Sequence, residues 1–366
     1  MNAMFDIIRT TIIPHLTSLR IARYDNMPGP RLEPFPYASL SHLQELEIAQ
    51  MITVEATLVG ALLAFPHLRK LELSMKLDLP AGAEEGFFPG FVALRDLHIT
   101  GTPDHLSRFL DVTVPPRLES LALTVLDWFP ITEEAAIAHL HAGIAHLARA
   151  PTPRFALQFD ALCQPIPSII DVLAPAMLLA HLTHVAVRIE RLELALPVTH
   201  ADLGALAGAW PRLVELELSV ASTGDEEEVL DVLDAPTAQV LACFAGRHPD
   251  LVRLTLPFVD LAMDFPELAS VPVLDHGLKT LRVSIIEGEP APRLRAFAML
   301  IDRLFPNLDL AEVQYPCDGR HIPGEDRRME NWCEVEQMLL ALQTGRTGAH
   351  RSQRLMLDSL ERGLYQ

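Results

Sequence analysis

The chain has 366 residues, more than one compact core usually supports, so it must either divide into domains or stack repeats that add core linearly. Its formal net charge of −19 argues against binding nucleic acid or an anionic membrane through bulk electrostatics, and leaves a basic protein partner open. No apolar run is long enough for a membrane span, the N-terminus does not resemble a signal peptide, and the cysteines form no C-x-x-C pair; a cytoplasmic or nuclear protein with reduced thiols is expected.

One pattern recurs along the chain: a short polar lead-in, often Pro-Arg or Pro-His, followed by L-x-x-L-x-L. The first five copies follow one another at intervals of 27, 25, 26 and 24 residues. They begin at Leu16, Leu43, Leu68, Leu94 and Leu118. These intervals lie within the ~20 to 29 residues that are typical of leucine-rich repeats.

The later copies are less regular. The sixth, PRFALQF, is degenerate, and we align it so that Leu157 and Phe159 take the last two apolar positions. Five further copies begin at Leu182, Leu213, Leu251, Leu278 and Leu308. Because these lie 31, 38, 27 and 30 residues apart, we expect inserted loops, the clearest at residues 222–228.

Each copy predicts a short strand with one buried face. The last two apolar residues lie two apart, so on a strand they point to the same side, and the first turns in from the preceding loop. Helix-compatible stretches separate the strands at 56–65, 104–112, 132–150, 200–210, 237–246 and 293–305. Asp104, Thr132 and Thr237 are plausible caps for three of these helices.

One strand and one helix cannot bury both of their apolar faces alone, so neighbouring repeats must stack. The sequence therefore predicts an α/β fold, a leucine-rich-repeat solenoid of about eleven repeats over residues 14–325, with a curved parallel sheet on its concave side and helices on its convex side. Residues 1–13 are expected to form an N-terminal capping helix, and residues 326–366 a C-terminal helical cap and tail.

The irregular spacing, the P-x-L-x-x-L-x-L lead-ins and the Pro-rich insertions resemble the leucine-rich-repeat region of fungal F-box-like proteins, from about Pro14 to Val313. In that family an F-box module docks on an adaptor of a cullin-RING ubiquitin ligase while the repeats hold a substrate, so the resemblance implies a substrate-recognition subunit. The first repeat begins at Pro14 and no Leu-Pro-x-Glu opening is found. A ligase adaptor is therefore expected as a partner only if an F-box lies upstream.

The residue between the last two apolar positions of each copy is expected on the open, concave face of the sheet, where solenoids usually bind their ligands. With Glu45 added, the candidate partner-binding residues are Arg20, Glu45, Glu47, Glu72, His98, Glu217, Arg282 and Glu312. In the degenerate copy the same position falls on Gln158. The acidic part around Glu47 and Glu72 suits a basic segment of a protein partner, although solvated strand faces are polar in any case.

Motifs for catalysis are not found: the sequence contains no Gly-rich phosphate loop, no G-x-S-x-G elbow and no H-E-x-x-H helix. The histidines at 139–146 and 181–184, and the cysteines and histidine at 317–333, match no standard metal spacing. We expect no catalytic residue, no cofactor and no metal, and hence a non-catalytic protein-protein interaction scaffold. A ubiquitin-ligase substrate receptor is the alternative, and an enzyme built around the histidines at 139–146 is a remote one.

Overall fold

A computed structural model describes residues 15–21, 40–78, 91–113, 115–126, 133–150, 152–160, 168–192, 198–222, 235–262, 265–287, 291–310 and 331–346. These residues form an α/β structure with parallel strands, as the sequence predicts. The chain divides into two compact units, Met1–Pro197 with Val220–Asp231, and Val198–Ser219 with Val232–Gln366. Among the described helices, none combines the length and the apolar character that crossing a membrane would require.

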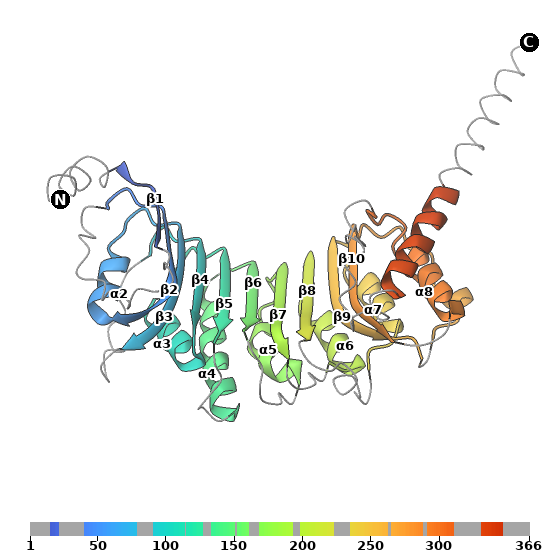
Figure 1. The fold of residues 1–366 in the computed structure, drawn as a ribbon, viewed down its shortest axis with the longest axis horizontal. Coiled ribbons are helices and arrows are strands. Elements are labelled where there is room, and N and C mark those ends of the chain that lie inside the picture. Colours follow the sequence, from blue (N-terminus) through green and yellow to red (C-terminus); the bar gives the residue numbers. More distant parts are fainter. Residues whose placement is uncertain are drawn as a thin grey trace, which may run out of the picture. The chain divides into compact units, whose positions relative to one another are not determined.

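The first unit is a parallel sheet whose strands pair in chain order (Figure 1). Its described strands are β1 (Ser18–Ile21), β2 (Glu45–Glu55), β3 (Lys70–Asp78), β4 (Asp96–Gly101), β5 (Ser120–Val125), β6 (Arg154–Phe159) and β7 (His184–Leu192). Its described helices are α2 (Ala56–Leu63), α3 (Pro103–Thr113), α4 (Glu133–Ala145), the short η5 (His146–Arg149) and α5 (Ile169–Met177). Helix α4 packs between α3 and α5, and α3 contacts β3 and β4, so successive helices cover the apolar side of the sheet.

The second unit repeats this alternation. Strands β8 (Glu215–Ser222, of which residues 215–219 belong to this unit), β9 (Arg253–Asp260) and β10 (Thr280–Glu287) pair in parallel in chain order. Its described helices up to residue 310 are α6 (His200–Ala209), α7 (Gln239–Arg247), the short η6 (Leu268–Ser270) and α8 (Ala291–Leu304). Helix α7 contacts both α6 and α8.

The predicted register of the apolar triplets is confirmed. Across β2, β3, β4 and β5 the second triplet positions are direct partners, and so are the third positions. These two rows are Leu46, Leu71, Leu97 and Leu121, and Ile48, Leu73, Ile99 and Leu123. All eight side chains are at most 3% exposed, so the triplets form continuous layers of the core. On β1 the equivalent residues are only half-buried.

The alignment of the sixth copy is wrong by two residues. Phe155 pairs with Leu121 and Leu157 pairs with Leu123, so the last two apolar positions are 155 and 157 rather than 157 and 159. The first position then falls on Thr152, which is fully buried and whose hydroxyl makes no hydrogen bond to the described residues. Because a threonine stands where the other copies have their first leucine, the sixth copy lacks the residue by which the motif is recognised, and it was aligned two residues too late.

Backbone hydrogen bonds connect the repeats just before each strand. In most copies two successive amides donate to one carbonyl of the preceding repeat: those of Arg95 and Asp96 lie 2.8 and 2.9 Å from the Arg69 oxygen. In the sixth copy Pro153 has no N–H, so only Arg154 donates, to the Glu119 oxygen at 3.2 Å. This ladder holds neighbouring repeats at the same level.

In most lead-ins the residue three positions before the first leucine is buried, and we call this the anchor position. The sequence pattern, in which the lead-ins are polar, did not predict it. The carbonyl of Trp210 accepts a hydrogen bond from the Leu213 amide at 3.1 Å, and the Trp210 side chain is fully buried. His248 takes this position before Leu251 and is 1% exposed. Its ring nitrogens make no hydrogen bond of normal geometry to the described residues. Burial lowers the pKa of His248, outweighing the nearby Ala207 carbonyl, which raises it.

Most predicted helices are present, with ends shifted by a few residues. Helix α5 was not predicted, because Pro175 lies inside it; its first turn is capped by the Ser168 hydroxyl, which accepts from the Ile170 amide at 3.1 Å. Thr237 is not a cap, since α7 begins at Gln239 and the Thr237 hydroxyl lies 3.3 Å from Nδ1 of His200. Asp104 lies in the first turn of α3, and Thr132 lies outside the described residues.

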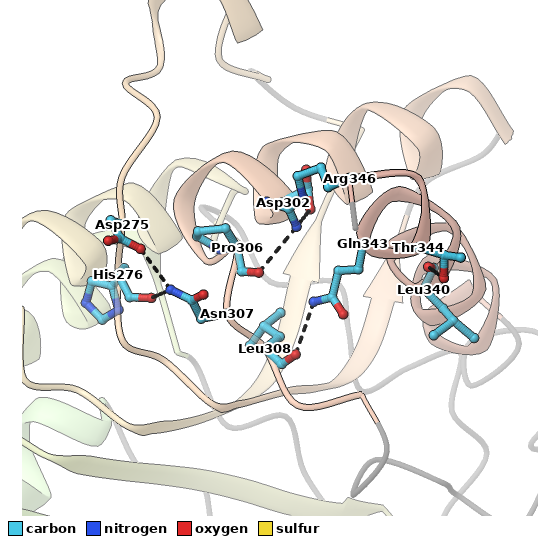
Figure 2. Close-up of polar contacts among 10 residues, drawn as sticks. All are labelled: Asp275, His276, Asp302, Pro306, Asn307, Leu308, Leu340, Gln343, Thr344 and Arg346. Atoms are coloured by element: carbon cyan, nitrogen blue, oxygen red, sulfur yellow. Dashed lines mark hydrogen bonds and ion pairs between the residues drawn. The ribbon is translucent and has the colours of Figure 1, made fainter. Parts of the chain in front are cut away.

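A helix over residues 331–346, within the predicted C-terminal cap and tail at 326–366, packs at the end of the second unit. Trp332, Val335 and Leu339 are its buried side chains. Figure 2 shows its polar contacts: Gln343 donates to the Leu308 carbonyl at 3.1 Å, and Arg346 donates to the Asp302 carboxylate at 2.5 Å. The predicted N-terminal cap at 1–13 and the tail after residue 346 lie outside the described residues.

Replacing one core leucine with a charged residue tests the register. Leu71 is fully buried, and Leu71→Asp should lower the free energy of unfolding by roughly 4 kcal/mol or more, because it leaves a cavity and buries a carboxylate. Ser74→Asp, which places the same group on the opposite face of β3, should change stability by less than about 0.5 kcal/mol. Urea unfolding followed by circular dichroism measures both; equal losses would contradict the assignment of faces.

The buried His248 should make stability depend on pH. Its pKa is lowered in the folded state, so its neutral form contributes stability above about pH 6.5, and this is lost as the pH falls and the unfolded chain takes up the proton. His248→Phe should flatten the dependence of the unfolding midpoint between pH 7.5 and 5.5. His67→Phe, at an exposed position, is the control. A profile for His248→Phe as steep as that of the parent would refute this role.

Candidate functional site

Four of the predicted binding residues lie side by side. Arg20, Glu47, Glu72 and His98 are successive register partners on β1, β2, β3 and β4. They alternate with the buried apolar positions, so they lie on the sheet face opposite the core. We call these four residues the charged row.

Ionic contacts run along the charged row. Nε of Arg20 lies 2.8 Å from Oε1 of Glu47, and Nδ1 of His98 lies 3.6 Å from Oε1 of Glu72. The two carboxylates are neighbours in register, and their side chains are 24% and 31% exposed. Like charges on directly opposite positions destabilise a sheet, and this acidic pair is flanked by the Arg20 cation on one side and by the His98 imidazole on the other.

Glu45, the fifth predicted residue of this unit, lies two residues before Glu47 on β2, in the neighbouring row of register partners on the same face. It is the register partner of both Ser18 and Lys70, and it accepts a hydrogen bond from the Ser18 hydroxyl at 3.3 Å. Lys70 is in turn the partner of Asp96. Charges of opposite sign therefore alternate in this row, whereas in the charged row two carboxylates lie together.

His98 is held on both sides. Its Nε2 lies 3.0 Å from Oγ1 of Thr124 on β5, and Thr124 is only 9% exposed. Burial lowers the pKa of His98 most strongly; Glu72 raises it, and Lys70 lowers it further. The neutral imidazole is therefore favoured near pH 7.

Beyond His98 the same row consists of small residues. Ala122, Ala156 and Ala186 follow one another in register on β5, β6 and β7. The sequence placed Gln158 here, but the corrected register moves Gln158 two residues along, beside Thr124 and Arg188. The charged part of the row thus ends at β4.

The remaining predicted residues do not join this surface. Glu217 and Arg282 belong to the second unit, where each is a register partner of Thr255 on the strand between them. Arg282 is also close enough to Glu336, on the helix over 331–346, to lower the pKa of that carboxyl, which burial raises overall. Glu312 lies outside the described residues.

The histidines considered for catalysis have separate structural contacts. Nε2 of His141 lies 2.5 Å from the carbonyl oxygen of Asp171 and so connects α4 to α5, whereas Nε2 of His146 lies 3.5 Å from the carboxylate of Asp111 on α3. Within the described part of the chain, no three His, Cys, Asp or Glu side chains are grouped to hold a metal ion. Residues 317–321 lie outside that part.

Sequence reasoning missed Thr124, because it considered only the residue between the last two apolar positions. The contact was within reach of the motif: Thr124 lies two residues after Ala122, on the same face of the neighbouring strand. Comparisons with known proteins add no identification, since no family model matches the chain and no curated protein matches it.

Proposed function

We propose that the chain is a leucine-rich-repeat solenoid that serves as a protein-protein interaction scaffold, and that the charged row together with Glu45 binds a basic segment of a protein partner. Strands at repeat intervals, paired in parallel within each unit, support the repeat assignment. A curved sheet with these residues on its concave side is the arrangement that such repeats adopt.

The observation that carries the proposal is the pairing of Glu47 with Glu72. Neighbouring strands lie about 4.8 Å apart, so two carboxylates in register repel each other unless a cation lies between them. A guanidinium or ammonium group from a partner would relieve this repulsion and could contact both carboxylates, and guanidinium suits carboxylates especially well because it donates several hydrogen bonds.

The neighbourhood of the pair favours an extended polypeptide over a single ion. Glu45 adds a third carboxylate on the same strand as Glu47, so negative charge extends along β2. The alanines that continue the row on β5 and β6 have short side chains, which lets a partner's backbone approach the sheet closely. A basic segment can thus place its cations over β2 and β3 while its uncharged part lies over the alanines.

A matched pair of double variants tests the proposed function. The probe is a fluorescent Gly/Ser peptide that carries two arginines two residues apart, and the readout is fluorescence anisotropy at pH 7.5. Glu47→Gln with Glu72→Gln should weaken binding roughly ten-fold, since each exposed ion pair contributes about 0.7 kcal/mol.

The control removes the same charge elsewhere: Glu134→Gln with Glu267→Gln changes exposed carboxylates at the start of α4 and before η6. It should change the Kd less than about two-fold, because distant charges are largely screened. Equal losses in the two double variants would mean that the peptide senses only net charge, and the proposed surface would then be rejected.

A further inference from the structure

We infer that His98 makes binding at the charged row depend on pH: the neutral imidazole leaves Glu72 to the partner's cation, and the protonated imidazole competes with that cation for the same carboxylate. This inference rests on the proposed function and adds a mode of regulation to it. It follows from the position of His98 between Glu72 and Thr124.

The contacts of the ring accommodate both protonation states. Nε2 lies 3.0 Å from Oγ1 of Thr124, and a hydroxyl can either donate to a bare ring nitrogen or accept from a protonated one. In the neutral ring, Thr124 donates to Nε2 and Nδ1 carries the proton toward Glu72. In the charged ring, Nε2 donates to Thr124 and Nδ1 still faces Glu72 at 3.6 Å. Protonation therefore needs only a rotation of the hydroxyl.

The charges around the ring give the sign of the coupling. Glu72 on β3 favours the protonated ring, while Lys70 on the same strand and burial oppose it. Asp96 lies two residues before His98 on β4, and the same-face residues of β5, Ser120, Ala122 and Thr124, are uncharged. A cation bound at Glu72 cancels the contribution that favours protonation, so it lowers the proton affinity of His98. By linkage, a proton on His98 weakens binding of the cation by the same factor.

The pH range in which this effect can be measured is bounded by the pKa values of the carboxylates and of the imidazole. Burial holds the pKa of His98 below its ordinary value, so the ring is neutral at pH 7.5 and takes up a proton only as the pH falls through this lowered pKa. Carboxylates in general stay ionised above about pH 5. Binding of a basic segment should therefore weaken between pH 7.5 and 5.5.

The experiment measures the Kd of the two-arginine peptide at pH 7.5 and 5.5 at constant ionic strength. For the parent chain the Kd should rise about five-fold or more, the lower end of typical coupling between two sites. For His98→Gln, which keeps a polar side chain beside Thr124 but cannot become cationic, it should rise less than two-fold. His67→Gln, at an exposed position on a lead-in, should behave like the parent.

A second readout follows the ring directly. NMR titration of His98 should give a lower pKa with saturating peptide than without it, because the bound cation cancels the contribution of Glu72 that favours the protonated ring. An unchanged pKa on saturation would overturn the inference even if the Kd varied with pH for other reasons.

The two proposals fail in distinguishable ways. If the peptide does not bind, or binds equally well when Glu47 and Glu72 are glutamines, the proposed function fails and the inference falls with it. If binding requires both carboxylates but the parent and His98→Gln lose the same affinity at pH 5.5, the surface stands and the role of His98 is refuted.

Discussion

Burial of the apolar triplets fixes the register of the parallel strands, and every other feature of the exposed sheet face follows from that register. Side chains alternate along a strand, so a slip of one residue would bring leucines to solvent and charged residues into the core. The triplets of β2 to β5 pair position for position. Just before these strands, two backbone amides of one repeat donate hydrogen bonds to one carbonyl of the preceding repeat, which keeps the strands in the same register. Equivalent motif positions consequently become neighbours in space, and Glu47 lies beside Glu72 as a result.

Polar residues replace apolar ones at a few core positions, and the backbone around them is arranged accordingly. Nδ1 of His276 accepts a hydrogen bond from the Leu278 amide at 3.0 Å, which leaves Nε2 to donate to the His248 carbonyl at 2.7 Å. The His276 ring also meets Phe305 edge-on at 5.2 Å, and Phe305 occupies the anchor position of the following lead-in. His248 thus takes the anchor position that tryptophan or phenylalanine occupies in other lead-ins, and His276, two residues before Leu278, is hydrogen-bonded through both of its ring nitrogens.

The motif predicted most of the strands because its evidence is local: three apolar positions at fixed offsets. It failed where a single residue broke the pattern, as when Thr152 replaced the first leucine and moved the sixth copy by two residues. Helix α5 was missed for a similar reason, since Pro175 argues against a helix unless tertiary packing overrides it. The division into two units has no signal in the repeat spacing.

The sequence predicted which residues of the candidate surface lie in one row, but not the contacts they make with residues at other motif positions. Arg20, Glu47, Glu72 and His98 share one motif position, so the repeat alone places them in a row. The contact between His98 and Thr124 joins different motif positions, and the proximity of Arg282 to Glu336 joins a strand to a helix far along the chain. Contacts of this second kind depend on how elements pack, which a one-dimensional pattern does not contain.

The distance along the row tests the register most directly. In a chain whose four native cysteines are replaced with serine, Glu47→Cys on β2 and Ala186→Cys on β7, carrying nitroxide labels, lie five strands apart in one row of the first unit. At about 4.8 Å per strand, pulsed electron paramagnetic resonance should give a single narrow distance of about 20 to 30 Å, allowing for label length and sheet curvature. A broad distribution, or a distance well beyond about 35 Å, would show that the strands do not stack in register, and the charged row would not exist.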